Sequence, residues 1–239
     1  MKEKVIGILG GMGPLATVEL FHRIVLLTPA KKDQEHPRII IYNNPKIPDR
    51  TEYILGKGES PLPELIRSAE KLENCGADFI IMPCNTAHLF VDEIQNSINI
   101  PLVSMIDAAV NKAKRMNLRR VGIMATTGTI VAGIYQNALR NGGMEPIIPS
   151  EKEQEEVMEG IYQGVKAGDI KLGKEKLLKI AREMEKRCDG IIAGCTEISV
   201  ALSQEDLEKP FIDALDAIAE KAVSLALGLE DKMEDKNLS

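Results

Sequence analysis

Two cysteines occupy matching positions in two similar segments of the chain. Cys84 lies in ADFIIMPCNTA (77–87), and Cys195 lies in CDGIIAGCTEI (188–198). In both segments an aspartate stands six residues before the cysteine, and apolar residues lie between them. Two thiols on opposite sides of one ligand can take a proton from one face of a carbon and return a proton to the other face. The pair therefore predicts inversion of a carbon centre by proton transfer.

Small polar residues follow each cysteine, as they do where a helix begins. Asn85, Thr86 and Thr196 suit the cap and first-turn positions, and backbone N–H groups there could hold a substrate carboxylate. The positive end of the helix dipole should lower the pKa of each thiol from its usual value of ~8.5. The alternatives are two small buried side chains, a disulfide or part of a metal site. No second pair of Cys or His at zinc spacing accompanies them.

Charged residues near these motifs are candidates for binding an acidic ligand. Arg50 lies in NNPKIPDRT, a proline-bounded loop, and an arginine can grip a carboxylate through two parallel hydrogen bonds. Lys166, in GIYQGVKAG, could supply a second positive charge. An ordinary surface arginine and a solvated helix lysine are the alternative interpretations. Glu197 could only cap a helix, but we favour a bond to the substrate ammonium or to the thiol proton. His88, about one turn after the first cysteine, either tunes that thiol or is structural.

Two loops follow matching apolar runs. In GGMG (10–13) the backbone N–H groups can approach a ligand closely, so Met12 is a candidate binding residue. The counterpart ATTG (125–128) carries threonine hydroxyls, and we expect Thr127 to bind the other end of the substrate. The first loop also matches the loose dinucleotide pattern G-x-G-x-x-A. The acidic residue expected after the next strand is missing, which weakens that interpretation.

Alternating strands and helices must position these residues. Short, nearly continuous apolar runs predict strands that are covered on both faces, at residues 5–9, 38–42, 79–82, 102–104, 121–124 and 190–193. Longer amphipathic segments predict helices at residues 15–27, 63–74, 87–96, 108–115, 130–141, 154–167, 174–186 and 215–227. This alternation predicts an α/β fold with mainly parallel sheets flanked by helices.

Similar segments occur in the same order in the two halves of the chain. Besides the two cysteine segments, VIGILGGMG resembles VGIMATTG, and IPLVSMIDA (100–108) resembles KPFIDALDA (209–217). Such repetition predicts two pseudo-symmetric lobes with the active site between them. We assign residues 1–103 with the C-terminal helix 212–228 to the first lobe, residues 104–211 to the second, and residues 229–239 to a polar tail.

Composition argues against several classes of partner. The net charge is −6 and we find no basic patch, which argues against nucleic-acid binding. Aromatic residues are 3% of the chain, too few for stacking platforms. No stretch is long and apolar enough to span a membrane. Four cysteines are too few for a disulfide scaffold and favour the cytoplasm. Cys75 and Cys188 do not occupy matching positions, so we expect both to be structural.

These motifs together resemble the aspartate/glutamate racemase superfamily, and most closely its aspartate racemase branch. The resemblance rests on GILGGMGPLAT (7–17), IPDRT (47–51), MPCNTAH (82–88) and GCTEI (194–198), and it extends to about residue 228. It implies catalysis by Cys84 and Cys195 on a small-molecule substrate, an amino acid, without pyridoxal phosphate, and it implies a homodimer. It also implies that Arg50 binds the side-chain carboxylate and that Lys166 supplies a second positive charge. Glutamate racemases typically carry His where this chain has Glu197, which favours aspartate.

The predicted activity is therefore interconversion of L- and D-aspartate without a cofactor or a metal. Within the superfamily, the alternatives are a glutamate or broad-specificity amino-acid racemase, or an isomerase of maleate or a hydantoin. Relatives that decarboxylate malonates keep one of the two cysteines, so the presence of both argues against that reaction. A non-catalytic amino-acid sensor or a nucleotide-binding module is the alternative from another class, and two matched cysteines argue against it.

Overall fold

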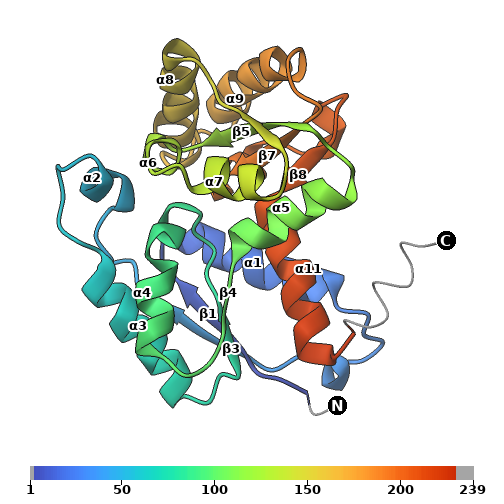
Figure 1. Ribbon diagram of the computed structural model, residues 1–239. Coiled ribbons are helices and arrows are strands. Elements are labelled where there is room, and N and C mark those ends of the chain that lie inside the picture. Colours follow the sequence, from blue (N-terminus) through green and yellow to red (C-terminus); the bar gives the residue numbers. More distant parts are fainter. Residues whose placement is uncertain (1–2, 230–239) are drawn as a thin grey trace.

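Two α/β lobes lie one above the other in the computed structural model, which describes residues 3–229 (Figure 1). The first sheet has the order β2-β1-β3-β4 and contains β1 (Ile6–Gly10), β2 (Ile39–Asn43), β3 (Phe79–Ile81) and β4 (Leu102–Val103). The second has the order β6-β5-β7-β8 and contains β5 (Arg120–Ala125), β6 (Glu145–Ile147), β7 (Gly190–Gly194) and β8 (Phe211–Asp213). All neighbouring strands are parallel. The shared strand order confirms the predicted pseudo-symmetric α/β fold.

Helices flank both sheets. Those of the first lobe are α1 (Pro14–Leu27), α2 (Arg50–Ile54), α3 (Leu62–Asn74) and α4 (Val91–Ser97). Those of the second are α6 (Thr127–Val131), α7 (Ile134–Asn141), α8 (Glu151–Glu159), α9 (Ile170–Glu185) and α10 (Thr196–Ala201). The helix α5 (Met105–Arg115) follows the first sheet, and the last helix, α11 (Ala214–Leu227), packs against both α1 and α5. The predicted tail is outside the described residues from residue 230 onward.

The sequence missed the short elements and the breaks within helices. The strands β6 and β8 have three residues each, too few to show a periodic pattern, and both lie at a sheet edge. The helices α2 and α10 are also short. The predicted helix 130–141 is two helices, because Gly133 adopts a left-handed conformation with a φ of 67°. The predicted helix 87–96 begins instead as a 3-10 helix, Thr86–Phe90, that leads into α4.

One hydrophobic cluster runs through both lobes. Ile6 and Ile8 of β1 contribute to it, as do Val121 and Ile123 of β5, together with the buried faces of α5 and α11. The next residue of β1, Leu9, belongs to a separate cluster beneath α3 and α4, as expected for strands that bury both faces. Because the sheets share a core, apolar packing as well as chain connection determines how the lobes sit relative to each other.

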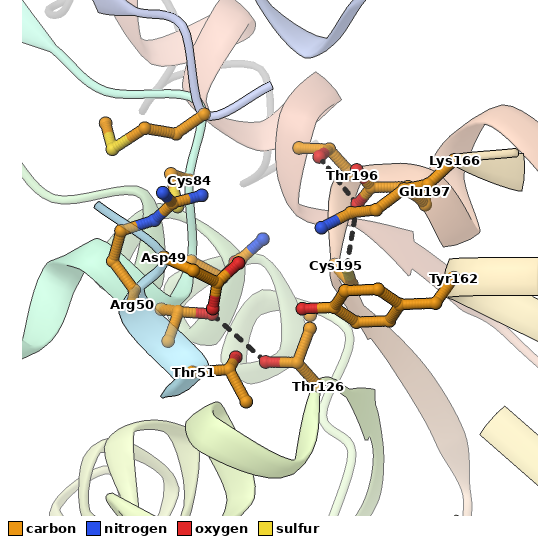
Figure 2. A pocket seen from close by; sticks show the side chains of 14 residues that line it. Asp49, Arg50, Thr51, Cys84, Thr126, Tyr162, Lys166, Cys195, Thr196 and Glu197 are labelled. Atoms are coloured by element: carbon orange, nitrogen blue, oxygen red, sulfur yellow. Dashed lines mark hydrogen bonds between the residues drawn. The ribbon is translucent and has the colours of Figure 1, made fainter. Parts of the chain in front are cut away.

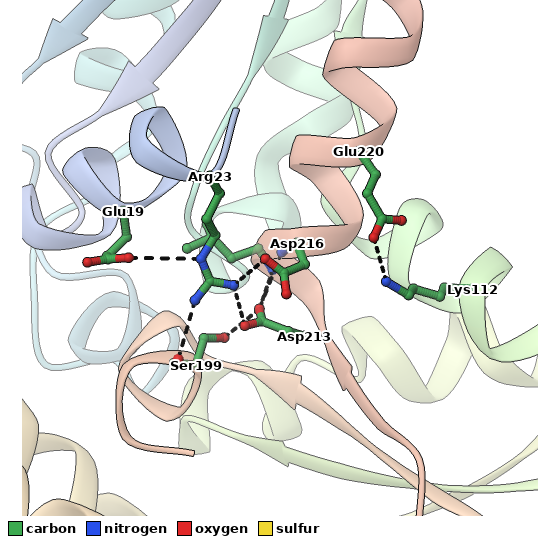
Figure 3. A network of polar contacts seen from close by, with 8 residues as sticks. Glu19, Arg23, Lys112, Ser199, Asp213, Asp216 and Glu220 are labelled. Atoms are coloured by element: carbon green, nitrogen blue, oxygen red, sulfur yellow. Dashed lines mark hydrogen bonds and ion pairs between the residues drawn. The ribbon is translucent and has the colours of Figure 1, made fainter. Parts of the chain in front are cut away.

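A network of ion pairs joins α1 to the second lobe (Figure 3). Arg23 donates hydrogen bonds to Asp213 and, at 2.6 Å, to Asp216, and its Nη2 donates to the carbonyl oxygen of Ser199 at 3.3 Å. Asp213 also accepts from the hydroxyl of Ser199 at 2.7 Å and from the backbone N–H of Leu215 at 2.8 Å. Burial lowers the pKa of Arg23, but the two carboxylates outweigh this effect and raise it overall.

We expect Arg23→Ala to lower the free energy of unfolding by about 3 kcal/mol, because Asp213 and Asp216 would keep adjacent negative charges without a cation. Urea denaturation measures the loss. The control is Lys112→Ala, which breaks a more exposed pair with Glu220 and should cost less than about 1 kcal/mol. Equal losses in the two variants would contradict a stabilising contribution of the Arg23 network beyond that of a surface ion pair.

Candidate active site

The carboxyl ends of the central strands of both sheets meet at one cavity between the lobes. The first lobe contributes Met12, Asp49, Arg50, Thr51, Cys84, Asn85 and Thr86. The second contributes Thr126, Tyr162, Lys166, Gly194, Cys195, Thr196 and Glu197. In each sheet the chain reverses its strand order here, between β1 and β3 and between β5 and β7, which is where open α/β sheets bind ligands. The two cysteines lie on opposite sides of this cavity (Figure 2).

A carboxylate accompanies the thiol of the second lobe. Cys195 Sγ donates a hydrogen bond to Glu197 Oε2 at 2.9 Å, and Thr196 Oγ1 donates to the same oxygen at 3.3 Å. Burial raises the pKa of Cys195 well above its usual value, and Glu197 raises it further. The prediction that a helix dipole lowers the thiol pKa is therefore wrong at this position, because α10 is short and burial dominates. Cys195 holds its proton at neutral pH.

An arginine accompanies the thiol of the first lobe. Burial lowers the pKa of Arg50, but the neighbouring Cys84 and Asp49 outweigh it and raise the pKa overall. The guanidinium is held in place because its Nη1 donates to the carbonyl oxygens of Ile47 at 3.2 Å and Pro48 at 2.8 Å. Its Nε is buried and has no hydrogen-bond partner among the residues that the structure describes. Arg50 therefore brings a fixed positive charge to the side of the cavity where Cys84 lies (Figure 2).

The helix that carries Arg50 is held over the cavity by the second lobe. Asp49 caps α2 by accepting a hydrogen bond from the backbone N–H of Glu52 at 2.9 Å. The helix packs on α6 so closely that a Cβ at Gly128 would lie 2.8 Å from Thr51 Oγ1. Glycine is therefore needed at position 128, and contact between the lobes helps to place α2 at the site.

Lys166 reaches the cavity from an unusual helical segment. The predicted helix 154–167 is α8 followed by a π-helix, Gly160–Val165, and Lys166 caps the end of the π-helix. Its Nζ lies 4.2 Å from the centroid of the Tyr162 ring. Burial lowers the pKa of Lys166, but neighbouring acidic groups, Glu197 first among them, outweigh burial and raise it overall. The lysine thus faces the Cys195 side of the site, where its positive charge opposes the effect of Glu197 on the thiol (Figure 2).

Three threonine hydroxyls join the lobes at the cavity wall. Thr86 Oγ1 lies 3.1 Å from Thr126 Oγ1 and 2.9 Å from Thr129 Oγ1, and the latter two are 3.1 Å apart. Thr126, which directly follows β5, lines the cavity, whereas the predicted Thr127 does not. Thr127 Oγ1 instead accepts a hydrogen bond from Gln154 at 3.3 Å. Thr126, directly after the strand, faces the site, and Thr127 already belongs to α6.

The structure brings together nine of the ten predicted site residues, all except Thr127. Sequence reasoning missed five that line the cavity: Asp49, Thr51, Thr126, Tyr162 and Gly194. Asp49 and Thr51 stand on either side of Arg50, and Tyr162 stands four residues before Lys166. For Asp49, Thr51 and Tyr162, the position beside a predicted cation was the signal from which the sequence could have identified them.

His88 is part of the framework that holds the Cys84 turn. Its Nε2 accepts the backbone N–H of Met105 at 3.0 Å, so the ring proton is on Nδ1, which donates to the carbonyl oxygen of Cys84 at 2.8 Å. Burial lowers its pKa to about 4. The two remaining cysteines do not line the cavity: Cys188 is buried in the core of the second lobe, and Cys75 is exposed at the end of α3.

The low pKa of His88 predicts an acid-sensitive fold. Below pH 6.5 the unfolded chain gains a proton that the folded chain does not bind until about pH 4, so stability is lost as the pH falls through this window. The loss attributable to His88 is roughly 3 kcal/mol. Urea denaturation at pH 7 and pH 4 should show a smaller difference for His88→Gln than for wild type. His22→Gln, on the exposed part of α1, is the control. If the loss of stability between pH 7 and pH 4 is the same in all three proteins, the assignment to His88 is contradicted.

Within residues 3–229, no three His, Cys, Asp or Glu side chains are grouped as ligands for a metal ion. No helix in this part of the chain is long and apolar enough to cross a membrane.

The two parallel sheets and the site between them define a two-lobed α/β racemase fold. A family model described as Asp/Glu/hydantoin racemase matches residues 9–222. The chain therefore belongs to the Asp/Glu/hydantoin racemase family, and it is an isomerase of the amino-acid racemase type. This confirms the family resemblance found in its motifs.

Known relatives cover nearly the whole chain. A broad specificity amino-acid racemase, RacX of Bacillus subtilis, is 29% identical over 230 residues, which are 95% of this chain and 100% of the relative. The structure of Picrophilus torridus aspartate racemase is 34% identical, covers 94% of each chain and has a TM-score of 0.86. An aspartate racemase homologue from Pyrococcus horikoshii is 30% identical, with 93% and 99% covered and a TM-score of 0.76.

Proposed function

We propose that this racemase interconverts L- and D-aspartate by a two-base reaction at Cys84 and Cys195. The observation that carries the proposal is that the two thiols line one cavity from different lobes. One cysteine takes the proton from Cα, and the other delivers a proton to the opposite face. Because the chain itself supplies both groups, the proposed reaction uses neither a cofactor nor a metal.

The charges around the thiols support a defined protonation state of the two cysteines in the free enzyme. Cys195 holds its proton through burial and its bond to Glu197, so we assign it as the proton donor of the free enzyme. Cys84, beside the Arg50 guanidinium, is assigned as the base that takes the α-proton in that direction. The two cysteines exchange their functions in the reverse direction, as reversibility requires.

The polar lining supports an acidic amino acid as substrate. Arg50 and Lys166 provide two positive charges for the two carboxylates of aspartate, from opposite sides of the cavity. Asp49 and Glu197 provide negative charges for its ammonium group. The two similar solved structures named as aspartate racemase or its homologue favour aspartate, and the full-length similarity to RacX favours broad specificity as the alternative.

A chiral substrate panel tests the proposal. Purified enzyme is dialysed against chelator, treated with a carbonyl-trapping reagent, and incubated with both enantiomers of aspartate, glutamate and several neutral amino acids. Maleate and a hydantoin complete the panel. Chiral chromatography should show the highest kcat/KM for aspartate, and alkylation of the thiols should abolish it. Equal turnover of neutral amino acids would instead establish broad specificity. Activity that returns only with a divalent metal would overturn the mechanism.

We further propose that the enzyme is a cytoplasmic homodimer. The helix α1 exposes Leu15, Val18 and Leu26 at 51%, 60% and 70%, an apolar surface that is typical of an interface. Light scattering should give the mass of a dimer, and a monomer would contradict this part of the proposal. A reducing compartment suits a reaction that depends on two free thiols.

A further inference from the structure

One buried side chain contacts both cysteine turns. Tyr135 of α7 is fully buried, and its hydroxyl donates a hydrogen bond to Asn85 Oδ1 at 2.6 Å. Asn85 directly follows Cys84. The ring of Tyr135 lies against Gly194, the residue before Cys195, so closely that a Cβ at Gly194 would be 2.9 Å from Tyr135 Cε2. A tyrosine of the second lobe therefore links the two turns.

The other end of the Asn85 amide is free. Asn85 is 3% exposed and lines the cavity, and its Nδ2 is buried with no hydrogen-bond partner among residues 3–229. Buried polar groups are nearly always paired, so an unpaired amide nitrogen beside a cavity is available to a ligand acceptor. A half-turn of the amide would place Oδ1 there instead, and an oxygen repels a carboxylate. The orientation of this amide therefore decides whether the site offers a donor or an acceptor.

We propose that Tyr135 is a positioning residue that holds the Asn85 amide with its N–H groups directed at an anionic ligand group. The hydroxyl of Tyr135 occupies Oδ1 and leaves Nδ2 for the ligand. Burial raises the pKa of Tyr135 well above its usual value, so at neutral pH the hydroxyl keeps the proton that it donates to Asn85 Oδ1. The ligand class, a carboxylate, rests on the proposed function.

The first test separates positioning from stability. Tyr135→Phe keeps the ring against Gly194 and removes only the hydroxyl. It should raise the KM for aspartate about tenfold and change kcat less. In an Asn85→Ala background the same substitution should have no further effect on KM, because the amide that it positions is gone. The control is Ser68→Ala, which removes another buried hydroxyl that does not line the cavity, and it should leave KM unchanged.

The second test needs no turnover. Iodoacetate carries a carboxylate, and iodoacetamide is its neutral counterpart. The rate of alkylation of Cys84 by iodoacetate, divided by the rate with iodoacetamide, therefore reports recognition of an anion. Mass spectrometry resolves each site, and the exposed Cys75 supplies the reference ratio in the same molecule. Tyr135→Phe should lower the ratio at Cys84 several-fold and leave it unchanged at Cys75. Ser68→Ala should change neither.

The outcomes are distinguishable. A lower melting temperature of Tyr135→Phe with an unchanged ratio and KM would make Tyr135 a purely structural residue and overturn the proposal. Effects of Tyr135→Phe and Asn85→Ala that multiply in the double variant would also overturn it, because the hydroxyl would then act independently of the amide. If the wild type racemises no acidic amino acid and the ratio still falls in Tyr135→Phe, the proposed function fails and the positioning by Tyr135 stands.

Discussion

Replacing either Cys84 or Cys195 with alanine should lower kcat for racemisation by about 10³- to 10⁴-fold, because one face of Cα then lacks its acid or base. Chiral chromatography measures the loss, and circular dichroism shows whether each variant is folded. Cys75→Ala, which removes an exposed thiol, is the matched control and should keep normal activity. Near-normal racemisation in both folded active-site variants would contradict the two-base assignment.

Isotope exchange distinguishes two bases from one. In deuterated water, early deuterium should enter mainly the newly formed enantiomer, since one thiol keeps the abstracted proton while the other delivers a solvent-derived one. The recovered starting enantiomer should remain largely unlabelled. Replacing one cysteine with serine should leave exchange of the α-proton in one enantiomer only, initiated by the remaining thiol. If only one cysteine proves necessary, a single-base reaction such as decarboxylation becomes the better interpretation.

The second large effect is expected for substrate binding. Arg50→Ala should lower kcat/KM for aspartate by about 10- to 150-fold, since a hydrogen bond to a charged group contributes about 1.5–3 kcal/mol. Arg50→Lys should recover only part of this loss, because lysine keeps the charge but loses the planar fork. Steady-state kinetics with aspartate measures both variants.

The control for Arg50 is an arginine outside the cavity. Arg67→Ala removes an exposed guanidinium of α3 that pairs with Glu64, and it should leave kcat/KM unchanged. Thermal unfolding shows whether loss of the bonds from Arg50 to Ile47 and Pro48 has affected the fold. Aspartate kinetics like those of the wild type in a folded Arg50→Ala protein would remove this residue from the binding site.

Local sequence patterns were sufficient to predict the architecture and to place Cys84 and Cys195 at one site between the lobes. Apolar runs of strand length alternate with amphipathic segments, and this pattern depends on neighbouring residues alone. The two similar halves predicted two pseudo-symmetric lobes, and the structure gives their sheets the same strand order. Cys84 and Cys195 were placed at strand ends, and parallel strands bring those ends to one edge of each sheet. Short edge strands such as β6 were missed because three residues show no period.

The tertiary structure alone decided how the site is charged and held. The pKa of Cys195 is raised because tertiary packing buries the thiol. The residues next to Cys195 in the sequence do not reveal this burial. The choice of Thr126 over Thr127 depends on where β5 ends and α6 begins. Tyr135 meets Asn85 across 50 positions of sequence, and Arg23 meets Asp213 across 190. Such contacts arise when two lobes pack on a shared core, and no periodicity within either segment encodes them.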